Sequence, residues 1–108
     1  MKNPTLLYPV EMSHVEEIEI ELPFYGKNLE TDPTEFVYVD KGGKATVIRK
    51  YAGIWRSLIT ISDARDMNHP GLNDYYEATF EEFREAFNDF IRQMSNIQLQ
   101  NRVIKEVV

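Results

Sequence analysis

The fold is decided by the stretch Thr79-Phe-Glu-Glu-Phe-Arg-Glu-Ala-Phe-Asn-Asp-Phe-Ile-Arg-Gln-Met-Ser-Asn-Ile-Gln98, whose apolar residues recur with the period of an α-helix. Large apolar residues follow one another at intervals of three or four and form an apolar stripe: Phe80, Phe83, Phe87, Phe90, Met94 and Ile97. A helix with a single apolar stripe buries it against another layer of its domain. The stretch therefore predicts an amphipathic helix that covers a sheet.

Both ends of this helix can be examined in the sequence. Thr79 and Glu82 have the spacing of a capping box, in which each side chain accepts a hydrogen bond from the backbone N–H of the other residue. No Gly or Pro occurs after Gly71, so no residue marks where the helix ends. We expect the helix over residues 79–100 and an apolar tail over 101–108, which suits a helix or a strand.

The residues before the helix show the two-residue period of β-strands. Glu17–Leu22 alternates glutamate with Ile or Leu, which predicts a half-buried strand that Pro23 ends. Gly26-Lys27-Asn28 and Asp32-Pro33 then indicate a loop. Further strands are expected over 35–39, 45–51 and 54–62, and residues 75–78 suit either a short fifth strand or an extended lead-in to the helix. The prediction is an α+β, two-layer fold in which one long C-terminal helix packs on an antiparallel sheet of four or five strands.

The register of the central hairpin depends on its turn. A two-residue loop at Gly42-Gly43 pairs Tyr38 with Val47, whereas a three-residue loop with a bulge shifts the pairing by one residue. Both alternatives remain open in the sequence. The alternation in the following strand places Trp55, Ile59 and Ile61 on one face.

Length and composition indicate one domain over residues 1–108. We expect an irregular arm over 1–14, which contains two prolines, and the sheet over 15–78. The chain has no cysteine, which excludes disulfides, thiolate metal sites and a cysteine nucleophile. Residues 1–12 lack the apolar run of a signal peptide and no stretch reaches 18 apolar residues, so we expect a cytoplasmic protein with no membrane contact.

Charge is distributed unevenly along this chain of net charge −6. Residues 1–40 carry nine acidic and two basic residues, whereas residues 41–65 carry six basic residues and one acidic residue. Cations interleaved with aromatic rings are typical of single-stranded nucleic-acid binding. The candidate nucleic-acid-binding residues are Lys44, Arg49, Lys50, Arg56 and Trp55, and they give the alternative function.

Residues that could carry catalysis form no known constellation. Acidic residues and one histidine follow the last long strand, at Asp63, Asp66, His69, Asp74 and Glu77, but their spacing matches no established metal-binding loop. The serines lack a nucleophile motif, and Gly42-Gly43 reads as a turn. We therefore expect no enzyme activity, no cofactor and no metal.

The apolar C-terminus is the candidate dimer contact, because an exposed apolar tail is unusual in a monomer. Its candidate contact residues are Val103, Ile104, Val107 and Val108. We expect a small, non-catalytic protein–protein interaction module that forms a homodimer. An acidic module of this kind suits an inhibitor or immunity-type protein that opposes a basic protein partner.

Overall fold

The computed structural model describes residues 3–9, 17–29, 33–67 and 71–107, with side chains described as far as Asn96. The strands are β1 (Thr5–Pro9), β2 (Glu17–Glu21), β3 (Phe24–Asn28), β4 (Thr34–Val39), β5 (Ala45–Tyr51), β6 (Ile54–Ile61) and β7 (Tyr76–Glu77). Two 3-10 turns, η1 (Ala64–Asp66) and η2 (Leu72–Asp74), precede the single long helix, α1 (Phe80–Val107).

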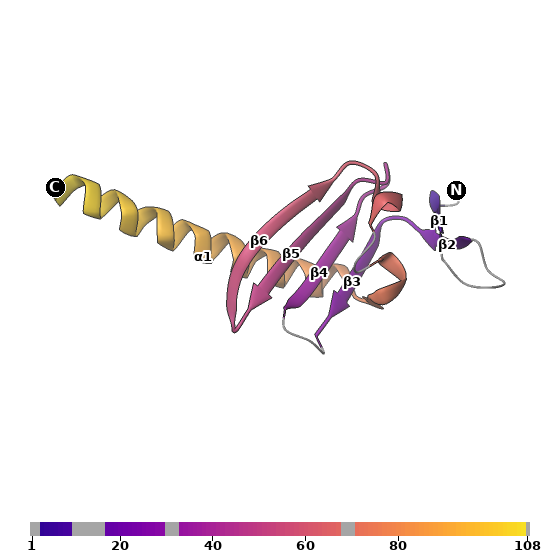
Figure 1. Cartoon of the computed structure of the whole chain (residues 1–108), viewed down its shortest axis with the longest axis horizontal. Coiled ribbons are helices and arrows are strands. Elements are labelled where there is room, and N and C mark those ends of the chain that lie inside the picture. The colour runs from indigo at the N-terminus through magenta and orange to yellow at the C-terminus, as the bar shows by residue number, and fades with distance from the viewer. Residues whose placement is uncertain (1–2, 10–16, 30–32, 68–70, 108) are drawn as a thin grey trace.

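The architecture is the expected α+β fold of two layers. An antiparallel sheet with the strand order β6-β5-β4-β3-β7 has α1 on one face, which we call the helix side. Figure 1 shows α1 crossing the sheet and running on past β6 to the C-terminus. Strands β1 and β2 form a separate two-stranded sheet at the other end of the molecule.

Two apolar cores hold these layers together, one on each face of the large sheet. The helix-side core contains Ile48 and Trp55 from the sheet and Phe83, Ala86 and Phe90 from α1. The opposite core joins alternate residues of β4 and β5 to the two-stranded sheet and to the η1 and η2 turns: Val37, Val39, Ala45, Val47, Leu6, Tyr8, Ile20, Leu22, Ala64, Met67, Leu72 and Tyr75. The large sheet is thus covered by α1 on one face and by chain segments on the other.

Three segments differ from the sequence-based expectation. Part of the expected irregular arm is strand β1, which pairs with β2 along its whole length. The predicted strand over Glu17–Leu22 is therefore β2 of the small sheet and is not part of the large sheet. The segment around Gly26, expected as a loop, is strand β3. A Cβ atom at Gly26 would lie 2.8 Å from both Tyr75 Cβ and Val37 Cγ1, so glycine is required here by close packing and does not mark a turn.

The hairpin between β4 and β5 has the three-residue loop. Asp40 pairs with Lys44 through its backbone N–H, and Val37 therefore faces Val47. Gly43 has φ +88°, as the bulge position of such a loop requires, and the Asp40 carboxylate accepts hydrogen bonds from the backbone N–H groups of Gly42 and Lys44. The pairing is shifted by one residue from that of a two-residue loop.

A β-bulge at Arg56 changes the direction of Trp55. Arg49 pairs with Ser57 and Lys50 pairs with Trp55, which leaves Arg56 without a partner on β5. The extra residue rotates Trp55 to the helix side, where it is 3% exposed. The prediction that Trp55 shares a face with Ile59 and Ile61 is therefore wrong, because strict alternation does not continue through a bulge.

Helix α1 begins with the predicted capping box. The hydroxyl of Thr79 accepts a hydrogen bond from the backbone N–H of Glu82 at 3.1 Å, and the Glu82 carboxylate accepts one from the backbone N–H of Thr79 at 3.1 Å. The helical backbone continues to Val107, so the segment that could have been helix or strand is helical.

Two tyrosines of the opposite core provide a matched test of this packing. Tyr8 donates its hydroxyl to the carbonyl of Met67, whereas the buried hydroxyl of Tyr75 has no hydrogen-bond partner within the described part of the chain. Tyr8→Phe should lower the free energy of unfolding by about 1–2 kcal/mol, because it leaves a buried carbonyl without this donor. Tyr75→Phe should leave it unchanged or raise it by about 1 kcal/mol. Urea denaturation followed by circular dichroism measures both, and an equal loss in the two variants would contradict the assignment.

Candidate functional site

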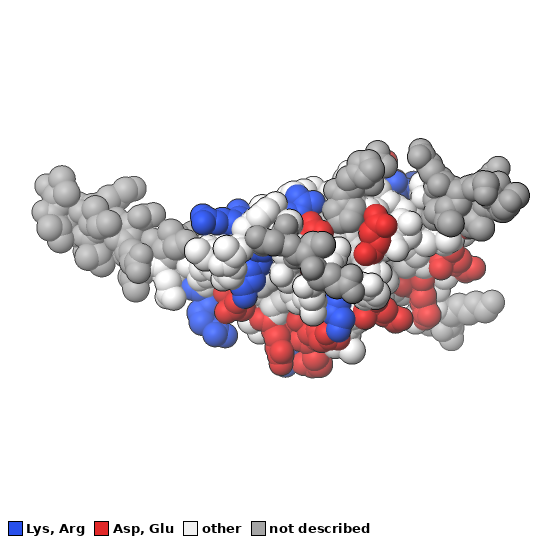
Figure 2. Space-filling model, turned by 60° about the horizontal axis from the view of Figure 1, so that its bottom comes forward, with Lys and Arg blue, Asp and Glu red and all other residues white. Residues whose placement is uncertain are grey.

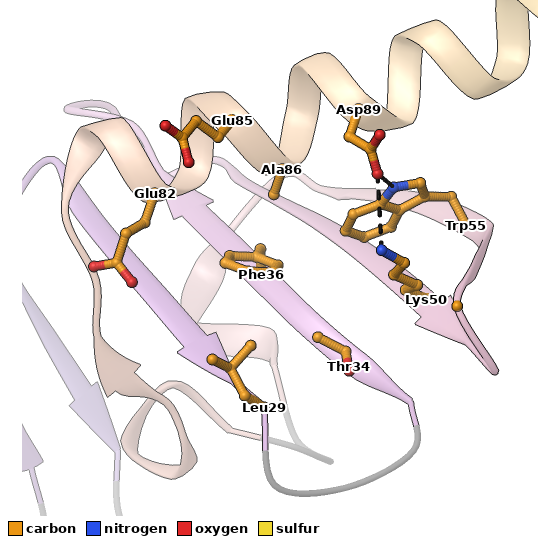
Figure 3. Close-up of a pocket in the computed structure, with 10 residues that line it drawn as sticks. Leu29, Thr34, Phe36, Lys50, Trp55, Glu82, Glu85, Ala86 and Asp89 are labelled. Atoms are coloured by element: carbon orange, nitrogen blue, oxygen red, sulfur yellow. Dashed lines mark hydrogen bonds and ion pairs between the residues drawn. The ribbon is translucent and has the colours of Figure 1, made fainter.

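An open groove of about 590 Å³ lies between the first half of α1 and the sheet. Its lining residues are Leu29, Thr34, Phe36, Lys50, Gly53, Trp55, Glu82, Glu85, Ala86 and Asp89. Figure 3 shows the three carboxylates along α1 above a floor that includes Phe36 and Leu29. The groove therefore has an acidic rim and an apolar floor.

The acidic rim follows from the spacing of residues on α1. Glu82, Glu85 and Asp89 stand three and four residues apart, which places them along one side of the helix. Phe83 and Phe90, one position further along, face the sheet and are buried. The apolar stripe thus fixes the rotation of α1, and the rotation brings the carboxylates to the edge of the sheet. Figure 2 shows acidic side chains gathered along one side of the molecule.

The two outer carboxylates of the rim are ionised and already engaged. Glu82 forms an ion pair with Lys27, and this hydrogen bond, together with that from the Thr79 backbone, lowers the pKa of Glu82. Asp89 accepts a hydrogen bond from the indole Nε1 of Trp55 at 2.8 Å, which is the main cause of its lowered pKa, and Lys50 lies 3.8 Å away. Neither carboxyl has the raised pKa of a general acid that works near neutral pH.

Glu85 occupies the middle of the rim, where its carboxylate has neither a hydrogen bond nor an ion pair with any described residue, and the residue is exposed. The floor beside it is partly uncovered, since Leu29 is 54% exposed and Phe36 is half-buried. An unneutralised carboxylate above apolar surface suits a side chain with an apolar stem and a cationic head, such as that of arginine or lysine.

One end of the groove is closed by a rigid group of contacts around Trp55. The Gln93 side chain accepts a hydrogen bond from the Trp55 backbone N–H at 3.0 Å and donates one to its carbonyl at 2.8 Å. The ammonium group of Lys50 lies 5.1 Å from the centre of the indole ring, a cation–π distance. Trp55, Phe90 and Gln93 together hold α1 on β6 at this end of the groove.

The candidate nucleic-acid-binding residues do not share one surface. Lys44 and Lys50 lie near opposite ends of β5, about 20 Å apart at ~3.3 Å per residue. Arg56 is exposed in the bulge, while Trp55 is buried against Phe90 and has no open ring face for a base. Arg49 lies on the opposite face of the sheet. This arrangement does not provide the continuous cationic groove with stacking rings that binds single strands.

The candidate dimer contacts lie at the end of α1. The side chains of Val103, Ile104 and Val107, and all of Val108, lie outside the described residues.

The acidic loop after β6 is held by local contacts. The Asp63 carboxylate accepts hydrogen bonds from the guanidinium and backbone N–H of Arg65, which lower its pKa to about 2. The Asp74 carboxylate accepts one from the backbone N–H of Gly71. Over residues 3–9, 17–29, 33–67 and 71–96, whose side chains the structure describes, no three metal-ligating side chains come together in a possible metal site.

We compared the chain with protein family models, with curated proteins and with solved structures, and none of the three comparisons found a match. Within the described part of the chain, no helix has the length and apolar content required to cross a membrane.

The groove was not predicted from the sequence. The spacing of Glu82, Glu85 and Asp89 was a usable signal for one charged side of the helix. The floor could not be found in this way, because Phe36 and Lys50 come from different strands, Leu29 follows a third, and they meet α1 only through the sheet order.

Arg49 and Lys50 are neighbouring cations that should contribute very different amounts to the free energy of unfolding. Arg49 pairs with Glu35, whose side chain is 5% exposed, so Arg49→Met leaves a carboxylate buried without its partner. We expect a loss of about 3 kcal/mol in the free energy of unfolding, at the low end for a broken buried pair because Arg49 retains 24% exposure. Lys50→Met removes a partly exposed contact and should lose about 1 kcal/mol or less. Urea denaturation of both variants measures the difference, and similar losses would show that the Glu35 pair is not a structural contact.

Proposed function

We propose that this chain is a non-catalytic protein–protein interaction module whose acidic groove receives a basic side chain of a partner protein. The single observation that carries the proposal is Glu85, an exposed carboxylate without a partner among the described residues, above the apolar floor of Phe36 and Leu29. A guanidinium or ammonium group would pair with Glu85, and its methylene stem would cover the floor.

The electrostatics of the groove support a binding role. Glu82 and Asp89 are ionised at neutral pH, as carboxyl groups with ordinary or lowered pKa values are, and Lys27 and Lys50 pair with them, so the unpaired negative charge of the rim is that of Glu85. A fixed negative rim attracts a cationic segment and speeds its association. The net charge of −6 acts in the same direction over longer distances.

Two further features belong to the proposal. The module works in the cytoplasm as a homodimer, and its partner presents a basic surface, as the target of an inhibitor or immunity-type protein would. The alternative, binding of single-stranded nucleic acid, is distinguished from this proposal by the experiment below.

The test uses a fluorescein-labelled hexa-arginine peptide as the probe and follows its anisotropy at low salt. We expect the wild-type chain to bind this peptide and Glu85→Lys to weaken binding at least tenfold, because about 1.4 kcal/mol or more of charge-assisted hydrogen bonding is lost. The matched control is Glu81→Lys, which changes the net charge equally on the same helix but alters a carboxylate that pairs with Arg84 outside the groove. Its affinity should stay within about threefold of the wild type, since only screened long-range attraction changes.

Two outcomes would contradict the proposal. Equal weakening by Glu81→Lys and Glu85→Lys would mean that the peptide follows the overall charge and does not occupy the groove. Binding of a labelled single-stranded oligonucleotide in preference to the hexa-arginine peptide would favour the nucleic-acid alternative, and that binding should fall steeply as salt is added.

A further inference from the structure

The two edges of the large sheet are protected to very different degrees. At one edge, β7 has two residues, Tyr76 and Glu77, and offers little backbone for pairing. At the other edge, β6 has eight residues and pairs only with β5 among the described strands. Natural proteins shorten, charge or cover exposed edges, because an open edge can pair with another chain. β6 has one charged residue, Arg56, so Ser57–Ile61 is an uncharged, regular edge.

The helix side of β6 is also partly uncovered. Leu58 lies directly opposite Ile48 of the helix-side core and therefore points to the same side of the sheet as α1. It is nevertheless 42% exposed, and Thr60, two residues further along, is exposed as well. The described contacts of α1 with β6 are made near Trp55, at the start of the strand.

Helix α1 continues well beyond the sheet that it covers. Its ring contacts pass from Tyr25 on β3, reached by Phe80, to Trp55 on β6, reached by Phe90. Those ten residues rise about 15 Å, and three strand spacings measure about 14 Å, so α1 crosses the strands nearly at right angles. The helix then runs about 20 Å further, from Ser95 to Val107, past the β6 edge. We call residues 95–107 the overhang.

The overhang has the composition of a buried helix. Five of its thirteen residues are large and aliphatic: Ile97, Leu99, Val103, Ile104 and Val107. Positions 97 and 104 continue the seven-residue spacing of Phe83 and Phe90, whereas positions 99, 103 and 107 lie four apart along another side of the helix. A helical segment of this length is marginal in water without packing partners, and apolar residues on two sides indicate burial between two surfaces.

We propose that two copies of the chain join their β6 edges in antiparallel orientation, so that the overhang of each copy packs on the helix side of the other copy's sheet. A two-fold axis perpendicular to the sheet keeps both α1 helices on the same side and makes the two edges self-complementary. Each overhang points across β6 toward the second copy, and its length of about 20 Å equals about four strand spacings. It reaches the partly exposed surface at Leu58 and Thr60 of that copy.

The elongated shape of the single chain and the area that two overhangs would bury are both consistent with this dimer. The radius of gyration is 16.5 Å, whereas a compact domain of this length has about 13 Å, and the overhang contributes to the longest dimension of 61 Å. Two overhangs, each about 20 Å long and ~10 Å wide, bury roughly 800 Å² when both surfaces are counted. The paired strand edges add to this area, toward the roughly 1,200 Å² at which the range of stable protein interfaces begins.

The inference rests on the homodimeric state proposed above and names the surface that forms it, so the test uses full-length chains and measures mass. Light scattering over a dilution series should give the wild type twice its chain mass of 12.7 kDa. Leu58→Lys should give 12.7 kDa with an unchanged circular dichroism spectrum, because it places a charge between the two copies at a position that is 42% exposed in the single chain. Leu7→Lys is the matched control, since Leu7 is 54% exposed on β1 at the other end of the molecule, and this variant should remain a dimer.

The possible outcomes test the homodimer and its contact through β6 separately. A wild-type monomer would overturn both the homodimer and its β6 contact. A folded Leu58→Lys variant that remains dimeric would overturn the β6 contact and leave the homodimer intact. If Leu58→Lys does not fold, hydrogen exchange of the wild type decides, because amide groups of Ser57–Ile61 that do not bond to β5 should exchange slowly in a dimer and rapidly in a monomer. Binding of the hexa-arginine peptide by folded Leu58→Lys is measured separately, so failure of the groove would not be confused with failure of the dimer.

Discussion

Trp55 is the contact on which the other layers of the structure depend. Its indole ring packs edge-on against Phe90, its Nε1 donates to Asp89, and both of its backbone polar groups bond to Gln93. A buried tryptophan removes about 150–250 Å² from water, which makes it a large part of the apolar core of so small a domain. These contacts hold α1 at one position on β6, and the direction of the helix follows from them.

Trp55 can hold α1 on β6 only because of the bulge at Arg56. Without the extra residue, Trp55 would point to the same face as Ile59 and Ile61, and Phe90 would have no aromatic partner on β6. The bulge also separates the part of β6 that α1 covers from the regular edge at Ser57–Ile61. One inserted residue therefore links the packing of the helix, the closed end of the acidic groove and the open edge of the sheet.

The same arrangement explains why charge gathers beside the helix. Once the apolar stripe of α1 is buried, the adjacent positions 82, 85 and 89 must lie at the border between helix and sheet. Lys27 and Lys50, on the helix side of β3 and β5, meet two of the three carboxylates and limit their repulsion. Glu85 remains between them as the charge that a ligand can neutralise.

The sequence by itself determined the elements whose signals are local. The cap of α1 at Thr79, the apolar stripe, the β4–β5 hairpin and the α+β class follow from capping, periodicity and turn residues close together in the chain. Only the tertiary structure decided that Gly26 lies in a strand, that β1 pairs with β2, that Trp55 faces α1, and which residues form the floor of the groove. The reason is physical: these features depend on contacts between distant segments, such as the close approach of Tyr75 to Gly26, and local propensity carries no information about which distant segment will meet it.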